Sequence, residues 1–242
     1  MNVLNSPTFI LNINVFDLNS VMKLADTDCC DVVCLTFNIE DAKDIDAAVV
    51  KLKEIQPLVK KPLMIRGASD DEIDKILIPE LIKNLDRQSI VATINENNYK
   101  EIVPFTAEKG HTISIRTPID INLAKEMNIL TSELGQPLDK ILIDSDIGGL
   151  GYGLDYGYSM IEKIKLEDEK YLNLPIISFV AEESLKTKEA KSSEFSSEYG
   201  NLTERAKMFE ISSVMSVIAA GADFVVVESP RVLKILKEVV NG

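Results

Sequence analysis

Two carboxylates and a cluster of glycines make up the stretch of this sequence best suited to chemistry. Asp144 and Asp146 follow the short apolar run 140–143, and glycines recur between Gly148 and Gly153. Carboxylates two residues apart at a strand end face the same way, so they could bind a metal ion or hydrogen-bond a ligand. No histidine stands nearby to complete a metal site. We therefore expect hydrogen bonding rather than a metal ion here.

The glycines match no nucleotide-binding motif. Gly149, Gly151 and Gly153 have G-x-G-x-G spacing, which differs from the dinucleotide fingerprint, and the sequence has no phosphate-loop motif. Because glycine loses the most backbone entropy on folding, such a segment usually lets the backbone approach a ligand or a partner closely. Three tyrosines accompany it, namely Tyr152, Tyr156 and Tyr158. They either pack the next helix onto the core or form a platform for a partner or cofactor.

Polar side chains also follow most of the other apolar runs. They are Asn14, Asp17, Asn38, Arg66, Asn95, Arg116, Asp120, Glu182, Glu183 and Glu228. Asn and Asp side chains can hydrogen-bond a heterocycle such as a pterin, or the amide side chains of a corrin ring. The alternative is that they are turn and N-cap residues, as Asp120 would be for the helix after it.

Composition narrows the classes of function. The formal net charge is −13, from 39 acidic and 26 basic residues, which argues against a nucleic-acid partner. His111 is the single histidine, which disfavours Ser–His–Asp catalysis and multi-histidine zinc sites. We see no signal peptide and no apolar run of the roughly 18 residues needed to span a bilayer. We expect a cytoplasmic protein that does not contact a membrane.

The three cysteines lie close together in the sequence, at Cys29, Cys30 and Cys34. Their odd number and clustering do not fit a secreted disulfide framework. They are also one short of the set of thiolates that usually holds a cubane iron–sulfur cluster. We expect buried apolar cysteines, with Cys30 and Cys34 on one face of a strand and Cys29 off it.

Short apolar runs alternate with helical patterns along the whole chain. The predicted strands are 9–15, 32–37, 63–66, 90–94, 112–116, 140–143, 176–179 and 224–227. The predicted helices are 18–25, 39–55, 70–85, 96–108, 120–134, 156–166, 202–220 and 230–240. About eight βα units in one chain of 242 residues predict an α/β fold, a single-domain (β/α)8 TIM barrel over residues 1–242. A doubly wound open sheet is the alternative. The polar segment 182–202 is a candidate lid or partner-docking loop.

Local signals set several helix ends. We expect Ser69 to cap the helix at 70–85 and Pro79 to break or kink it. Gly110 and Gly221 are placed as C-caps of the helices that precede them. Since active sites of such barrels lie where the strands end, the polar residues named above should meet at the C-terminal face.

Three long motifs carry a family resemblance. They are PIDINLAKEMN at 118–128, LDKILID at 138–144 and GLGYGLDY at 149–156. Shorter matches occur at 62–67, 97–99, 110–111, 174–176, 188–191 and 219–223. The chain resembles the small subunit of the corrinoid/iron–sulfur protein, which in archaea is the delta subunit of the acetyl-CoA decarbonylase/synthase complex. The resemblance is clearest over residues 60–235.

The resemblance implies a TIM barrel related to pterin-binding methyltransferases. In that family the subunit pairs with a large, or gamma, subunit that carries the iron–sulfur cluster and most of the corrinoid site, and the barrel mouth covers the corrin. The pair moves a methyl group from a methyl-tetrahydropterin to the acetyl-CoA synthase complex, in a Wood–Ljungdahl type pathway. The resemblance thus implies a shared corrinoid, no iron–sulfur cluster in this chain, and a subunit that is non-catalytic or depends on its partner.

On this basis we predict a set of cofactor-binding residues and no metal ligands. The set is Asn95, Asp120, Asn122, Asp144, Gly149, Gly151, Tyr152, Gly153 and Glu182. Two other functions stay open. One is a free-standing methyltransferase that holds a methyl-pterin with Asn95, Asp120 and Asp144. The other is a barrel whose ligand site has decayed and which serves assembly.

Overall fold

Eight parallel strands close into a barrel in chain order, so the predicted TIM barrel is confirmed and the open sheet is wrong. The computed structural model describes residues 6–148, 150 and 153–241. The strands are β1 (Thr8–Asn14), β2 (Val32–Thr36), β3 (Leu63–Arg66), β4 (Ile90–Ile94), β5 (Thr112–Arg116), β6 (Ile141–Asp144), β7 (Ile176–Ser178) and β8 (Phe224–Val227). Each lies within one or two residues of its predicted range, because β-branched runs bounded by turn residues are a strong strand signal.

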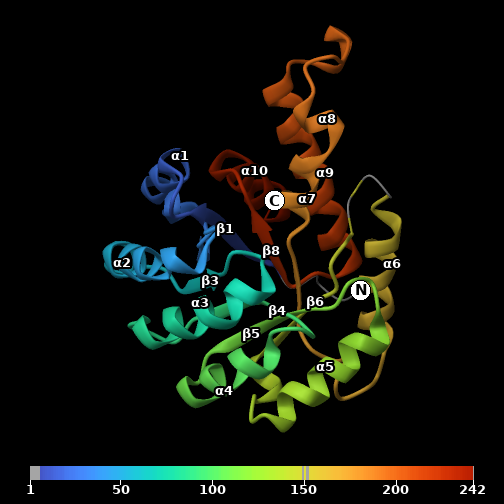
Figure 1. Cartoon of the computed structure of the whole chain (residues 1–242). Coiled ribbons are helices and arrows are strands. Elements are labelled where there is room, and N and C mark those ends of the chain that lie inside the picture. Colours follow the sequence, from blue (N-terminus) through green and yellow to red (C-terminus); the bar gives the residue numbers. More distant parts are fainter. Residues whose placement is uncertain (1–5, 149, 151–152, 242) are drawn as a thin grey trace.

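Helices surround the barrel (Figure 1). They are α1 (Leu18–Val21), α2 (Ile45–Ile55), α3 (Asp71–Asn84), α4 (Tyr99–Lys109), α5 (Ile121–Glu133), α6 (Asp155–Leu166), α7 (Val180–Lys186), α8 (Lys188–Lys191), α9 (Leu202–Ala220) and α10 (Pro230–Asn241). Short 3-10 turns are η1 (Met22–Cys29), η2 (Ala42–Asp44), η3 (Gln56–Leu58), η4 (Leu138–Lys140) and η6 (Ser197–Tyr199). In the described part of the chain, no helix is both long enough and apolar enough to cross a membrane.

The core has two layers that follow the period of two along each strand. Outward positions, such as Ile65 and Ile143, pack against the helices in one large cluster. Inward positions fill the barrel with a smaller cluster: Ile10, Val32, Cys34, Met64, Ala92, Leu142, Ile177 and Val226. The inside of the barrel is thus a packed core rather than a channel.

Most predicted helix ends are confirmed. Gly110 and Gly221 end α4 and α9 in the left-handed conformation, with φ of 70° and 113°. Asp120 caps α5, accepting hydrogen bonds from the backbone of Asn122 and Leu123 at 2.8 and 3.1 Å. The Pro79 prediction is wrong as to a break, because α3 runs through this residue.

The predicted Ser69 cap is wrong. Asp70 caps α3, since its carboxylate accepts from the backbone N–H of Glu72 and Ile73 at 3.0 and 3.1 Å. A carboxylate satisfies two such donors at once and also favours the positive end of the helix dipole. Ser69 instead adopts a left-handed φ of 64° and turns its hydroxyl toward Arg66.

The cysteine prediction is partly wrong. Cys30 and Cys34 are fully buried, as expected, but they do not share a face. Cys34 points into the barrel, whereas Cys30 packs in the outer cluster between barrel and helices. The physical reason is that Cys30 ends the 3-10 turn η1 and β2 starts only at Val32, so strand alternation does not reach back to it.

The segment after β7 projects from the barrel. Figure 1 shows α8, the turn after it and the first part of α9 extending away from the other helices. Arg205 of α9 holds this projection together: its guanidinium donates to the carbonyl oxygens of Glu189, Ser192 and Gly200. The predicted segment 182–202 is therefore partly helical. Its first helix, α7, starts two residues earlier, at Val180.

Candidate functional site

On several strands the inward positions change from apolar to polar toward the C-terminal end. Met64 is followed two residues later by Arg66, Leu142 by Asp144, and Val226 by Glu228. Because side chains of a strand alternate between faces, each of these polar residues sits directly above an apolar one in the barrel. The result is a polar layer at the mouth on top of a dry core.

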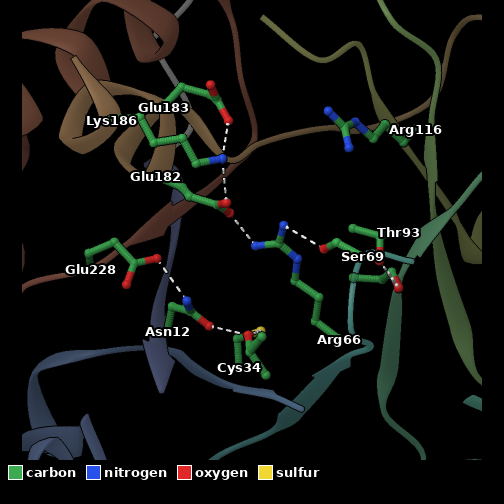
Figure 2. Close-up of polar contacts among 12 residues, drawn as sticks. Asn12, Cys34, Arg66, Ser69, Thr93, Arg116, Glu182, Glu183, Lys186 and Glu228 are labelled. Atoms are coloured by element: carbon green, nitrogen blue, oxygen red, sulfur yellow. Dashed lines mark hydrogen bonds and ion pairs between the residues drawn. The ribbon is translucent and has the colours of Figure 1, made fainter. Parts of the chain in front are cut away.

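An ion-pair bridge crosses this layer from β3 to α7 (Figure 2). The Arg66 guanidinium pairs with Glu182 through one nitrogen, and Nη2 donates to the Ser69 hydroxyl at 3.3 Å. Glu182 also pairs with Lys186 at 2.7 Å, and Lys186 with Glu183 at 2.7 Å. Burial alone would raise the pKa of Glu182, but the charges of Arg66 and Lys186 outweigh it and hold the pKa at about 2. The bridge is therefore ionised throughout the physiological range.

Asp144 differs from Glu182, because nearby positive charges do not offset the cost of burying its carboxyl. Asp144 is 4% exposed, and the only hydrogen bond that its side chain accepts in the described part of the chain comes from the Asp146 backbone N–H at 3.0 Å. Burial raises the pKa of Asp144 to about 7, and the Asp146 charge adds to the rise, while Arg116 and Arg66 oppose it. Asp144 is thus poised between its neutral and ionised forms near neutral pH.

The neighbouring Asp146 holds Arg116 in place. Arg116 Nε and Nη2 both donate to Asp146 Oδ2, at 2.9 and 2.6 Å. Asp146 has a left-handed φ of 46°, and its Oδ1 accepts from the backbone of Ile147 and Gly148 at 2.7 and 3.2 Å. This local hydrogen bonding allows a non-glycine residue to keep a strained conformation beside the mouth.

Amide and hydroxyl groups line the other side of the bridge. Thr36 donates to Asn12 at 2.6 Å. Asn12 in turn donates to Glu228 at 2.8 Å (Figure 2). Lys23 approaches Glu228 at 3.9 Å. The buried carboxyl of Glu210, on α9, accepts from the backbone of Glu228 at 2.7 Å and so fixes the end of β8.

The loop after β3 is held by a buried carboxyl. Asp74 accepts from the backbone N–H of Ala68 and Ser69 at 2.6 and 3.1 Å. A Cβ atom at Gly67 would lie 2.1 Å from Asp74 Oδ1, so only glycine fits there. Burial raises the pKa of Asp74 to about 6 despite these hydrogen bonds. This arrangement places Ser69 beside Arg66.

The mouth contains two cavities that share the bridge as a wall. The smaller, of about 90 Å³, is lined on one side by Arg116, Asp144 and Asp146, with Thr93 and Phe179. The larger, of about 550 Å³, is also lined by amides and cations: Asn12, Asn14, Asn38, Lys23 and Lys191. Arg66, Ser69, Glu182 and Lys186 line both cavities. Small-molecule pockets usually span about 300–1,000 Å³, so the larger cavity alone has that size.

The structure brings together only some of the predicted site residues. Asp144 and Glu182 line the smaller cavity. Asn95 instead donates to Asp71 at 2.7 Å, beside α3. Asp120 is the exposed cap of α5, and Asn122 lies in a shallow groove on that helix. These last three residues do not line either mouth cavity.

The glycine segment is only partly placed. Gly149, Gly151 and Tyr152 lie outside the described residues. Gly153 has a left-handed φ of 107°, which fits the need for glycine at this turn. Tyr158 packs against the outer core cluster, whereas Tyr156 is 63% exposed. Packing therefore accounts for Tyr158, and Tyr156 remains available to a partner.

Sequence reasoning missed several residues of the mouth. Asn12 lies before the end of β1, Thr36 is the last residue of β2, and Lys23 and Lys186 come from helical segments. Counting back in steps of two from Asn14 would have found Asn12, because inward positions alternate. The lysines gave no such signal, since a lysine in a helix is usually only a solvated surface residue.

In the described part of the chain, no group of three or more His, Cys, Asp or Glu side chains is arranged to hold a metal ion. The polar layer is instead arranged for hydrogen bonding: it offers guanidinium, amide and hydroxyl donors together with carboxyl acceptors. A ligand that carries several amides or a polar heterocycle would match this chemistry.

The comparisons with known proteins agree on family and fold. A family model described as CO dehydrogenase/acetyl-CoA synthase delta subunit matches residues 13–228. The acetyl-CoA decarbonylase/synthase complex subunit delta of Archaeoglobus fulgidus is 28% identical over 205 residues, covering 80% of this chain and 45% of the relative. That of Methanosarcina thermophila, subunit delta 1, is 27% identical over 214 residues, covering 83% and 48%. The chain thus spans about half the length of these relatives.

Among solved structures, the barrel is similar to dihydropteroate synthases. The Yersinia pestis enzyme in a sulfonamide drug complex superposes with a TM-score of 0.74 at 10% identity, covering 98% of this chain and 94% of that one. The Thermus thermophilus enzyme gives 0.68 at 12% identity, with coverage of 98% and 93%. At such identities the likeness establishes the fold alone.

Proposed function

Because this chain belongs to the CO dehydrogenase/acetyl-CoA synthase delta subunit family, we propose that it is the barrel subunit of a corrinoid/iron–sulfur methyl carrier. In this proposal it joins a large, gamma-type subunit within an acetyl-CoA decarbonylase/synthase complex. Its mouth covers the corrinoid that the partner holds, and the pair passes on a methyl group taken from a methyl-tetrahydropterin.

The single observation that carries this proposal is the polar layer over a sealed core. The larger cavity, open at the mouth, is lined by the amides of Asn12, Asn14 and Asn38. Amides of this kind can pair with the carboxamide side chains of a corrinoid, each group donating to and accepting from the other. The residues present therefore fit such a group at the mouth.

The corrinoid, when bound, would supply the metal centre that carries the methyl group. The chain's own residues would do the rest. The Asn12–Glu228 pair is held by Lys23 and by the Glu210 brace, so its amide is fixed before any ligand arrives. Preorganised donors of this kind orient a ligand without further loss of entropy. The apolar cluster below them fills the inside of the barrel.

A second candidate is a free-standing pterin-dependent methyltransferase, and one observation favours it. A general acid works best when its pKa lies near the operating pH, and the pKa of Asp144 is raised to about 7 by burial. Against it stands the size of the cavity beside Asp144, about 90 Å³, which is small for a pterin unless the Arg66–Glu182 bridge moves. We therefore rank it second.

Co-purification tests the proposal. The chain should co-elute in size-exclusion chromatography with a corrinoid-loaded gamma-type subunit, and the complex should keep the corrinoid absorbance. Charge reversal at the mouth, Lys186→Glu, should weaken the complex. It replaces the cation between Glu182 and Glu183 with a third carboxylate, and the three negative charges repel one another. The matched reversal Lys165→Glu, at the opposite end of the barrel, should leave the complex unchanged.

The outcomes separate the candidates. If neither a complex nor bound corrinoid is found, the proposal fails. Calorimetry of the chain alone with methyl-tetrahydropterin then decides the second candidate, which requires binding that Asp144→Asn weakens and Asn95→Ala does not, since Asn95 lies outside the cavity. A complex that forms without bound corrinoid, from a chain that does not bind the pterin, would leave a barrel that serves assembly only.

A further inference from the structure

Several hydrogen-bond donors at the smaller mouth cavity have no acceptor in the described part of the chain. Arg66 is 8% exposed, and its Nε finds no hydrogen-bond partner in the described part of the chain. Arg116 uses Nε and Nη2 for Asp146, and the described residues provide no acceptor for its Nη1. The Ser69 hydroxyl accepts from Arg66, which leaves its own hydrogen free to donate.

A buried guanidinium nitrogen without a partner is costly, so it points to a missing acceptor. In Figure 2 the Arg66 guanidinium lies between Glu182 and Ser69. Arg116 and Thr93 lie on the same side of the view as Ser69. Both guanidinium groups line the same cavity, together with Asp144. The acceptor that completes this arrangement must therefore fit between the two arginines and beside Asp144, the one carboxyl of the cavity that pairs with no cation among the described residues.

Size and shape restrict what the acceptor is. A cavity holds one water for each roughly 10–15 Å³ of this kind of volume, so about 90 Å³ admits a molecule of a few heavy atoms. Planar guanidinium groups match the planar fork of a carboxylate, and acetate, with four heavy atoms, has the size that this volume admits. We propose that this cavity binds a small carboxylate, which accepts hydrogen bonds from Arg66 Nε and from Arg116.

The charges around the cavity make this binding depend on pH. Arg66 from β3, Arg116 from β5 and Lys186 from α7 face it as cations, and Asp146, Glu182 and Glu183 face it as anions. These three positive and three negative charges cancel, so the net charge around the cavity depends on whether Asp144 is protonated. Burial, more than any neighbouring charge, raises the pKa of Asp144 to about 7. Below that pH the neutral carboxyl tolerates an anion and can donate to it; above it, two carboxylates repel each other.

Titration of the full chain with ¹³C-labelled acetate, followed by NMR, tests the site. Ionic strength is kept constant with sodium chloride. We expect a saturable shift that is about tenfold tighter near pH 6 than near pH 8, because the neutral fraction of Asp144 changes about tenfold over that range. Arg66→Gln should weaken binding near pH 6 by about tenfold or more, which is the usual effect of losing a charged donor.

Two further variants keep the result decisive. Lys165→Gln removes one positive charge far from the mouth, where Lys165 pairs with Asp223, and should leave acetate binding unchanged. Asp144→Asn should abolish the pH dependence and bring the affinity near pH 8 up to that near pH 6, which a merely structural role for Asp144 would not do. The site is disproved if no saturable shift occurs near pH 6, or if Lys165→Gln weakens binding as much as Arg66→Gln.

This carboxylate site goes beyond the proposed function and does not depend on it. The titration uses the chain alone, so its failure would leave the co-elution test with a corrinoid-bearing partner unaffected. Conversely, acetate binding would stand even if no partner were found.

Discussion

The two ends of the barrel are both polar, but they use polar groups differently. At the N-terminal end the charged side chains pair with the backbone of the strands. Asp31 accepts from the N–H of Phe9 at 2.9 Å, and Asp223 accepts from the N–H of Ile176 at 2.7 Å. Each of these carboxylates satisfies a donor that no strand neighbour reaches. This end therefore holds the strands in register.

At the mouth the inward-facing polar groups pair mainly with other side chains. Arg66 reaches Glu182 across the barrel, and Asn12 joins Glu228. A contact between two side chains can be exchanged for a contact with a ligand without unfolding a strand, whereas a backbone contact cannot. The two ends therefore differ less in polarity than in the partners of their polar side chains. Side-chain partners are typical of the mouth, where a ligand would bind, and backbone partners are typical of the N-terminal end, which holds the strands together.

Gly67→Ala should have the largest effect, because it disturbs one of the side-chain contacts to backbone that also support the mouth. The new Cβ would lie 2.1 Å from Asp74 Oδ1 and would displace the carboxyl that holds Ala68 and Ser69. We expect a loss of about 4 kcal/mol in the free energy of unfolding, measured with urea. In a double-mutant cycle, the same change made on top of Asp74→Ala should cost far less. Equal costs in both backgrounds would show that Asp74 is not the obstacle.

Asp144→Asn should stabilise the protein, which sharpens the contrast between the two ends. The pKa of Asp144 is raised from 3.8 to about 7, so folding favours the protonated form. The stability that this gives is full below pH 3.8 and is lost as pH rises toward 7. At pH 8 the ionised, buried carboxyl destabilises the folded state. We expect the variant to gain about 3 kcal/mol in the free energy of unfolding at that pH and little near pH 4. Urea midpoints at both pH values measure this; an equal gain at both would contradict it.

Asp223→Ala, at the N-terminal end, should destabilise the protein. It leaves the buried N–H of Ile176 without its acceptor and removes the partner of Lys165. We expect a loss of about 2 kcal/mol in the free energy of unfolding, with ligand binding at the mouth unchanged. Chemical denaturation and the acetate titration measure the two properties on one preparation. A change in ligand binding would break the division between the ends.

His111 should give the smallest effect, visible as a pH dependence. Burial lowers the pKa of His111, with Lys109 and Lys140 adding to this, and its Nδ1 accepts from the Ser89 backbone at 3.0 Å. Folding thus favours the neutral ring, so its contribution to stability is lost as pH falls below about 6.5. The buried carboxyls of the mouth act in the opposite direction. The difference between wild type and His111→Gln isolates the histidine, and it should change between about pH 7.5 and 5.5.

Much of the fold could be predicted from local signals. The strands are short β-branched runs, and Asp120, Gly110 and Gly221 mark helix ends through their own side chains or their lack of one. Ser69 and Asp70 are both good capping residues, and only the left-handed turn that Asp74 imposes on Ser69 decides between them. Such a decision depends on a contact that the sequence does not reveal.

The candidate site was harder to predict, because it is built across the barrel. Asp144 could be recognised as a carboxyl at a strand end, and it does line a mouth cavity. Asn95 has the same signature but turns to Asp71, because α3 brings that carboxylate within 2.7 Å. Lys186 reaches the mouth only because α7 folds back over it. A position at a strand end therefore predicts a candidate site residue, and the loops and helices that follow determine whether its side chain lines the mouth.

Hydrogen–deuterium exchange of the chain, alone and with a corrinoid-loaded gamma-type subunit, tests the central claim most directly. The account predicts protection of the segments around the mouth, namely the loops after β3 and β6 and helix α7, with unchanged exchange at the N-terminal end near Asp31 and His111. Protection at the N-terminal end, with the mouth exchanging as freely as in the isolated chain, would contradict it.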